Sequence, residues 1–128
     1  MNAHADAIEL LAGGWRALSF APFRPGVEMC MLVDGGADGA SAAVLRYAAG
    51  ASVPRHLHQG LESVLVLEGS QSDENGCYRS GSIVFNQAGT EHSVWSEEGC
   101  VVLIQWERPV LILEGDVERG AERPDARA

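Results

Sequence analysis

The chain has 128 residues, 46% of them hydrophobic, which gives room for one domain with a hydrophobic core but not for two. Eighteen acidic residues against nine basic ones give a net charge of −9, and no basic stripe occurs along the sequence. This balance argues against a nucleic-acid backbone or an anionic membrane surface as a partner.

The N-terminal segment, residues 1–14, shows no basic region followed by a long apolar stretch, so we predict no signal peptide. No apolar run in the chain reaches the roughly 20 residues that a membrane-spanning helix needs. We therefore expect a cytoplasmic protein. Residues 5–11 predict a short helical turn, with Ile8 and Leu11 on one face.

Beyond this segment, short apolar stretches alternate with turn sequences, and fifteen glycines and five prolines are spread along the chain. This alternation favours an all-β fold over a helical bundle. Strands are expected near residues 15–20, 28–33, 42–48, 62–68, 81–86, 92–95, 101–106 and 110–113. The pattern predicts one jelly-roll β-barrel or sandwich over residues 15–113, followed by a loose, charged tail over residues 114–128.

Several expected strands are apolar on both faces, as at residues 64–67 and 101–104. A sheet with one face in water should alternate apolar and polar residues instead. Part of the outer face is therefore expected to be covered, either by the N-terminal segment or by a second copy of the chain. We favour a homodimer.

The three cysteines, Cys30, Cys77 and Cys100, are far apart in the sequence and form no CxxC pair. An odd, widely spaced set is typical of reduced thiols and not of a disulfide framework. Cys30 and Cys100 lie in or beside apolar strands and are expected to pack there, whereas Cys77 lies beside a turn. No metal-binding or catalytic role is expected for any of the three.

Three of the four histidines fall in two short segments. In an extended chain, residues i and i+2 point to the same face, so His56 and His58 present both imidazoles to one side. Glu62 opens the next strand and can return a carboxylate to the same place, and His92 enters a later strand. By itself a His-x-His pair also occurs in cores and on strand surfaces, so this spacing leaves structural and metal-binding roles open.

The complete spacing resembles the cupin superfamily. Gly50-x5-His56-x-His58-x3-Glu62-x6-Gly69 is similar to the first cupin motif, and Gly81-x7-Gly89-x2-His92 is similar to the second. The family pattern has proline where this chain has Gln87 and asparagine where it has Ser96, and neither position is a metal ligand. The resemblance implies a cupin barrel that binds one divalent transition metal (Fe, Zn, Mn, Ni or Cu) through His56, His58, Glu62 and His92.

A closer resemblance extends from Glu62 to Gly81, together with Ser96 to Cys100. These stretches resemble the cupin domain of ChrR-type anti-sigma factors and small cupins of the acetylacetone-dioxygenase type. The resemblance implies a non-haem metal-dependent dioxygenase acting on a small oxygenated or carbonyl compound. The alternative is a non-catalytic zinc-bound sensor or ligand-binding module. The family's separate sigma-binding domain has no counterpart in residues 1–14, so a stand-alone anti-sigma role is not expected.

Two further side chains are candidates for binding a small-molecule substrate or ligand. Arg46 and Gln105 lie on expected strands that could line the barrel, where either could orient an anion or an amide. With strands that are apolar on both faces, the sequence equally allows each side chain to point outward into solvent.

Overall fold

Residues 7–113 are described by the computed structural model, and this part of the chain contains ten β-strands preceded by two short 3-10 helices. In it, no helix is long and apolar enough to cross a bilayer. The elements are η1 (Leu10–Ala12), η2 (Gly14–Ala17), β1 (Ala21–Arg24), β2 (Val27–Val33), β3 (Ser41–Tyr47), β4 (Ser52–Leu57), β5 (Glu62–Asp73), β6 (Gly76–Arg79), β7 (Ile83–Asn86), β8 (Glu91–Trp95), β9 (Cys100–Trp106) and β10 (Leu111–Ile112).

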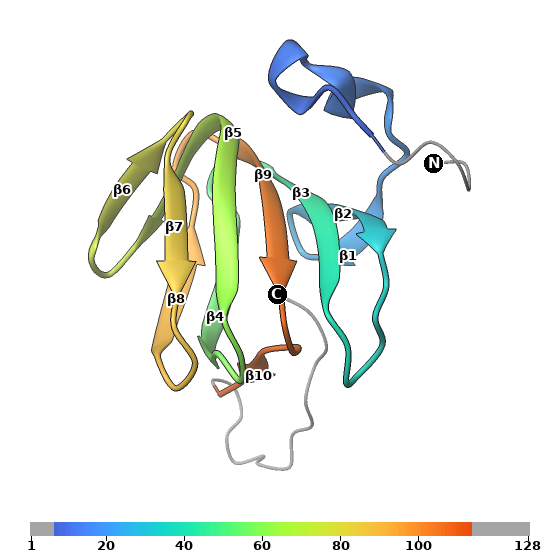
Figure 1. Ribbon diagram of the computed structural model, residues 1–128. Helices are drawn as coiled ribbons and strands as arrows, with labels where there is room; N and C mark the ends of the chain where they lie inside the picture. The colour runs from blue at the N-terminus through green and yellow to red at the C-terminus, as the bar shows by residue number, and fades with distance from the viewer. Residues whose placement is uncertain (1–6, 114–128) are drawn as a thin grey trace.

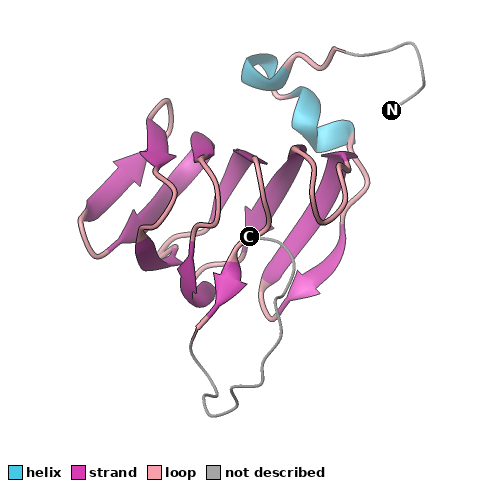
Figure 2. Cartoon of the chain, turned by 60° about the horizontal axis from the view of Figure 1, so that its bottom comes forward, coloured by secondary structure: helices cyan, strands magenta, loops and turns pink. Residues whose placement is uncertain are grey.

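The strands form one antiparallel sheet that curls on itself, as Figures 1 and 2 show. Neighbouring strands follow the order β1-β2-β3-β9-β5-β8-β4-β10, while β6 and β7 both pair with β5. This arrangement confirms the predicted all-β jelly-roll. It also makes β5 the hub of the fold, since its first half pairs with β9 and β7 and its last residues pair with β6 and β8.

The change of partners along β5 depends on a glycine. Gly69 has a φ of 75° and pairs with Cys100 at the end of the β9 ladder. A Cβ atom at this position would collide with the carbonyl oxygen of Gly99, so only glycine fits. The sequence predicts a strand that stops at residue 68, whereas the structure continues it to Asp73, on the far side of this corner.

Most of the other expected strands are confirmed as β2, β3, β7, β8, β9 and β10. The strand expected at residues 15–20 is wrong, because Gly14–Ala17 forms η2 and β1 begins only at Ala21. A 3-10 turn has three residues, which directs Trp15 and Leu18 to the same side of the chain. The turn expected at residues 5–11 lies partly outside the described residues, which begin at position 7, and η1 forms at Leu10–Ala12.

Two hydrophobic clusters lie on opposite faces of the curled sheet. The inner cluster fills the barrel and includes Leu45, Val66 and Val102, each at most 1% exposed. The outer cluster is centred on Trp15, which packs against Val44 and Val101. The N-terminal segment therefore covers part of the outer face, as one of the two alternatives from the sequence predicts. Figure 1 shows this segment (blue) beside one end of the sheet.

All three cysteines are free thiols in very different surroundings: Cys77 is exposed, Cys30 is half-buried, and Cys100 is 4% exposed. Burial raises the pKa of the Cys100 thiol to about 11. At pH 8 roughly one Cys100 thiol in a thousand is then ionised, and only the thiolate reacts readily.

We therefore expect iodoacetamide at pH 8 to modify Cys77 within the folded protein while Cys100 stays unmodified until the chain is unfolded. Peptide mass spectrometry over a time course checks this order, with the variant Cys77→Ser as the control that removes the fast site. Equal labelling rates at Cys77 and Cys100 in the folded protein would contradict the burial of Cys100.

Candidate metal centre

Three histidine rings meet inside the barrel. His56 on β4 and His92 on β8 are direct partners in the β4–β8 ladder, and their ring centroids lie 4.7 Å apart. His58 follows the end of β4, with ring centroids 5.1 Å from His56 and 4.6 Å from His92. All three residues are at most 6% exposed. The predicted convergence of the two histidine segments is therefore confirmed.

The local chain path explains why these histidines share one face. Pro54 has no amide hydrogen, and the β4–β8 ladder is irregular between Val53 and His56, which lets both of these residues face the barrel interior. Beyond the strand, the backbone amide of His58 donates to the carbonyl oxygen of Thr90 at 2.9 Å. The carbonyl oxygen of His58 accepts from the amide of Gly89 at 2.8 Å, which anchors the turn before β8.

Each imidazole uses its Nδ1 atom in a hydrogen bond to an oxygen outside the cluster. Carbonyl and carboxylate oxygens only accept, so each Nδ1 carries a hydrogen and Nε2 is the ring nitrogen left to bind a metal ion or a proton. This arrangement is typical of metal-binding histidines, whose second ring nitrogen is fixed by such a partner. The bonds join His56 to the Pro54 carbonyl (2.7 Å), His58 to the Thr90 carbonyl (3.0 Å) and His92 to Asp73 Oδ2 (3.0 Å).

The carboxylate of Glu62 lies against this cluster and is 3% exposed. Its Oε1 atom accepts a hydrogen bond from Nδ2 of Asn86 at 2.9 Å and lies 3.3 Å from Nε2 of His58. Burial alone would raise the pKa of Glu62, but His58, His56 and the Asn86 amide together hold it below its ordinary value. Burial lowers the pKa of His56 to about 4, so this imidazole is neutral at physiological pH.

The mutually close ligand atoms come from the three histidines, and Glu62 is not part of this group. One ligand nitrogen from each of the three histidines can be chosen so that all lie within 4.8 Å of one another. Within residues 7–113, no hydrogen-bond partner is found for His58 Nε2, His92 Nε2 or Glu62 Oε2, although all three atoms are buried. Lone pairs buried this close together repel unless a cation or a proton lies between them. The donor set therefore fits a divalent metal ion.

A small cavity adjoins His56, His92 and Glu62. It is walled by nine residues, each at most 9% exposed: Tyr47, His56, Glu62, Val64, Gln71, Asn86, His92, Val94 and Ile104. Its volume is about 10 Å³, close to the lower limit for holding a single water molecule. The site therefore leaves little space for an organic molecule in this conformation.

The sequence did not identify the residues that hold the histidines in place. Asp73 belongs to a turn sequence, and its Oδ1 atom does accept from the backbone amide of Asn75 at 2.8 Å, as expected of a turn aspartate. Its other oxygen orients His92, which only the bend of β5 at Gly69 makes possible. For Asn86 the sequence predicts only a place in a strand, and its register opposite Glu62 lets its amide bond to that carboxylate.

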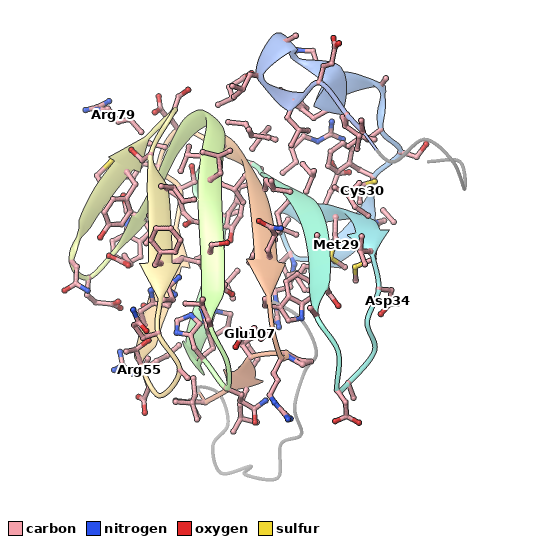
Figure 3. The ribbon with its side chains drawn as sticks, viewed as in Figure 1. Met29, Cys30, Asp34, Arg55, Arg79 and Glu107 are labelled. Atoms are coloured by element: carbon pink, nitrogen blue, oxygen red, sulfur yellow. The ribbon has the colours of Figure 1, made fainter. Side chains whose placement is uncertain are left out.

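Arg46 and Gln105 lie away from the histidine cavity. Arg46 alternates with the buried Leu45 and Tyr47 on β3, and its Nη2 atom lies 2.7 Å from Oε1 of Glu28. Gln105 is exposed on β9 and lines a surface groove. The structure thus follows the second alternative from the sequence, in which these side chains point outward. Figure 3 labels Arg55 on β4 and Glu107 just after β9 at the barrel end farther from the N-terminal segment.

Comparison with sequence families shows that residues 12–108 match the family described as the ChrR cupin-like domain. The anti-sigma-E factor ChrR of Cereibacter sphaeroides is 35% identical over 98 residues, which make up 75% of this chain and 43% of ChrR. The chain therefore spans less than half of the length of this relative.

Solved structures with similar folds include a chain of Rhodobacter sphaeroides SigE in complex with the anti-sigma ChrR. The match has a TM-score of 0.67 and 29% identity, and it covers 77% of this chain and 54% of that chain. An acetylacetone dioxygenase from Acinetobacter johnsonii matches with a TM-score of 0.69, covering 85% of this chain and 76% of that chain. Its sequence identity is 16%, so this likeness shows the fold alone.

Proposed function

Because the chain belongs to the family of ChrR cupin-like domains, we propose that it binds one divalent transition metal per chain inside the barrel. His56, His58 and His92 would bind it through Nε2, and Glu62 would bind it through its unpaired Oε2 atom. The observation that carries this proposal is the set of buried lone pairs with no partner among the described residues. Three imidazoles and one carboxylate suit Fe, Mn, Ni, Zn or Cu.

We further propose that the metal site serves a non-catalytic, ligand-responsive module in preference to an oxygenase for organic substrates. A bound divalent metal supplies a Lewis acid with open coordination positions. The chain itself supplies three buried imidazoles and a buried carboxylate, beside a cavity whose apolar wall residues are Val64, Val94 and Ile104. The cavity of about 10 Å³ supports this choice, because a diketone or aryl ketone is many times larger than a water molecule.

Two measurements distinguish these functions. Elemental analysis of protein purified without chelator identifies the metal, and oxygen consumption by the ferrous-loaded protein is followed across a panel of diketones and aryl ketones. We expect about one metal ion per chain and no oxygen consumption above the rate of the metal-free protein. Turnover of any panel member that requires ferrous iron and is lost in His92→Ala would instead establish the dioxygenase.

The hydrogen bond from His92 to Asp73 predicts a role for this carboxylate in metal affinity. Replacing such a partner of a metal-binding histidine typically weakens metal binding about 10- to 100-fold. We expect Asp73→Asn to weaken binding by this amount, measured by competition with a chromophoric chelator. The matched control is Glu74→Gln, since Glu74 is exposed and bonds to Ser93 instead. Equal affinities in the two variants would contradict the proposed role of Asp73.

The outer face of the sheet supports the homodimer expected from the sequence. Ile83 and Phe85 on β7 are 53% and 58% exposed, and Ile83 lies beside Leu65 in a row that continues to Leu103 on β9. We expect light scattering to give twice the mass of one chain, and Phe85→Glu to give a monomer. Leu11→Glu changes an apolar residue elsewhere that is even more exposed, at 86%, and should remain a dimer. A monomeric wild-type protein would refute the dimer.

A further inference from the structure

The tip of the β5–β6 hairpin contacts β8 next to one of the proposed metal ligands. Oδ2 of Asp73 accepts a hydrogen bond from Nδ1 of His92 at 3.0 Å, and Oε1 of Glu74 accepts from the backbone amide of Ser93 at 3.2 Å. Figure 1 shows this hairpin at one side of the barrel. Two consecutive hairpin residues thus bond to two consecutive residues of β8, so the hairpin is in a position to orient His92.

A tyrosine on the other strand of the hairpin reaches the same carboxylate. In the β5–β6 ladder Asp73 lies opposite Gly76, and Gln71 lies opposite Tyr78. Gly76 has no side chain, and a Cβ atom there would lie 3.6 Å from the hydroxyl oxygen of Tyr78, so the tyrosine ring lies over the glycine. Its hydroxyl group donates to Oδ1 of Asp73 at 3.1 Å. Burial and the charge of Asp73 raise the pKa of Tyr78 above its ordinary value, so the phenol keeps the hydrogen that it donates.

The hydrogen bonds to Asp73 are divided between its two carboxylate oxygens. Oδ1 accepts from the backbone amide of Asn75 at 2.8 Å and from Tyr78, which leaves Oδ2 for His92. Rotation of the carboxylate group about its Cβ–Cγ bond would break these bonds. Asp73 is only 6% exposed, so water cannot readily replace a lost donor. Tyr78 therefore helps to hold Oδ2 where it meets the imidazole of His92.

We propose that Tyr78 is a positioning residue for the metal centre, acting through Asp73 on His92. The inference rests on the proposed metal site and adds a residue that is neither a proposed ligand nor part of the wall of the cavity beside the site. A partner that fixes Nδ1 keeps Nε2 directed at the metal ion, and such partners contribute to metal affinity. Tyr78 is half-buried, and its ring packs against the inner cluster. Tyr78→Phe would keep this packing and remove only the hydroxyl group.

Competition with a chromophoric chelator for zinc measures the effect on affinity. We expect Tyr78→Phe to bind zinc about three- to tenfold more weakly, the effect of losing one hydrogen bond. The matched control is Ser80→Ala, which removes a hydroxyl group just after β6 that donates to the carbonyl oxygen of Leu67 at 3.2 Å. This control leaves the bonds of Asp73 in place, so its zinc affinity should equal that of the wild type. Equal losses in the two variants, or unchanged affinity in Tyr78→Phe, would overturn the proposal.

A double-mutant cycle tests whether Tyr78 acts through Asp73. Asp73→Ala removes both carboxylate oxygens, so Tyr78 has no acceptor through which to affect His92. In this background we expect Tyr78→Phe to cause no further loss of zinc affinity, because the effects of residues in one hydrogen-bond network are not additive. A further loss as large as in the wild-type background would overturn the proposal, since Tyr78 would then act through packing alone.

The metal-free protein provides a second measurement, which depends neither on zinc nor on the folding of Asp73→Ala. NMR follows the exchange of the histidine Nδ1 hydrogens with water. We expect this exchange to be severalfold faster at His92 in Tyr78→Phe, and unchanged at His58, which bonds to Thr90 instead. An unchanged rate at His92 would overturn the role of Tyr78. Wild-type protein that takes up no zinc would refute the metal site itself, so the two failures are distinguishable.

Discussion

Replacing His58 by alanine is expected to abolish stoichiometric metal binding. The wild-type protein should carry about one metal ion per chain, because the three imidazole nitrogens and one carboxylate oxygen proposed as ligands would complete a transition-metal site. Without His58, the ion would lose one of its three imidazole ligands. Elemental analysis of both proteins after identical purification provides the comparison.

Metal-linked stability gives a second readout of the same change. A ligand that binds only the folded chain stabilises it by about 2.7 kcal/mol at a free concentration of about 100 times its Kd. Added metal should therefore raise the melting temperature of the wild type and leave that of His58→Ala unchanged. An equal rise in the melting temperatures of both proteins on adding metal would refute the proposed metal centre.

Because His58 is 1% exposed, its removal leaves a void, and circular dichroism must first show that the variant folds. A conservative pair of variants avoids this difficulty. Glu62→Gln keeps the shape of the side chain but removes the charge next to the histidines. Glu91→Gln makes the same chemical change at an exposed carboxylate that pairs with Arg55. Metal affinity should fall in the first variant and stay unchanged in the second.

Replacing Trp15 by alanine is expected to destabilise the fold by about 3 kcal/mol. Truncating a buried tryptophan removes its apolar contacts and leaves a cavity, and such changes cost about 3–5 kcal/mol. Trp15 is 7% exposed and is the centre of the cluster that covers Val44 and Val101 on the outer face of the sheet. Its loss would uncover these side chains to solvent, whereas the inner cluster would keep its packing.

Urea denaturation measures the free energy of unfolding of both proteins. The control is Leu11→Ala, because Leu11 is 86% exposed in the same segment and its truncation should change stability by less than about 0.5 kcal/mol. A decrease below about 1 kcal/mol for Trp15→Ala would mean that the N-terminal segment contributes little to covering the sheet.

The amino-acid sequence by itself determined the fold class and the histidine cluster. Turn residues between short apolar stretches specify an all-β chain, because glycine, asparagine and aspartate favour turns through local backbone effects. His56 and His58 share a face because side chains alternate along an extended chain, which is also a local property. The spacing of His92 within its motif identified the third histidine through the resemblance to cupins.

Other features depended on contacts between distant parts of the chain. The 3-10 helix at Gly14–Ala17 replaced the expected strand because Trp15 and Leu18 pack on the outer face of the sheet, and their spacing suits a turn of three residues. The pairing of β3 with its neighbours decided that Arg46 points outward. A strand that is apolar on both faces lacks the alternation of apolar and polar residues from which the inward face could be predicted.

The hydrogen-bond partners of the proposed metal ligands were decided only by the tertiary structure. Asp73 reaches His92 because β5 turns a corner at Gly69, and Asn86 reaches Glu62 because β7 pairs with β5 in that register. Tyr47 faces the cavity because β3 and the end of β5 close the barrel around it. Each of these contacts joins residues far apart in the chain. The sequence shows which side chains could bind a metal ion or orient its ligands. Strand register and sheet curvature decide which of these side chains come together.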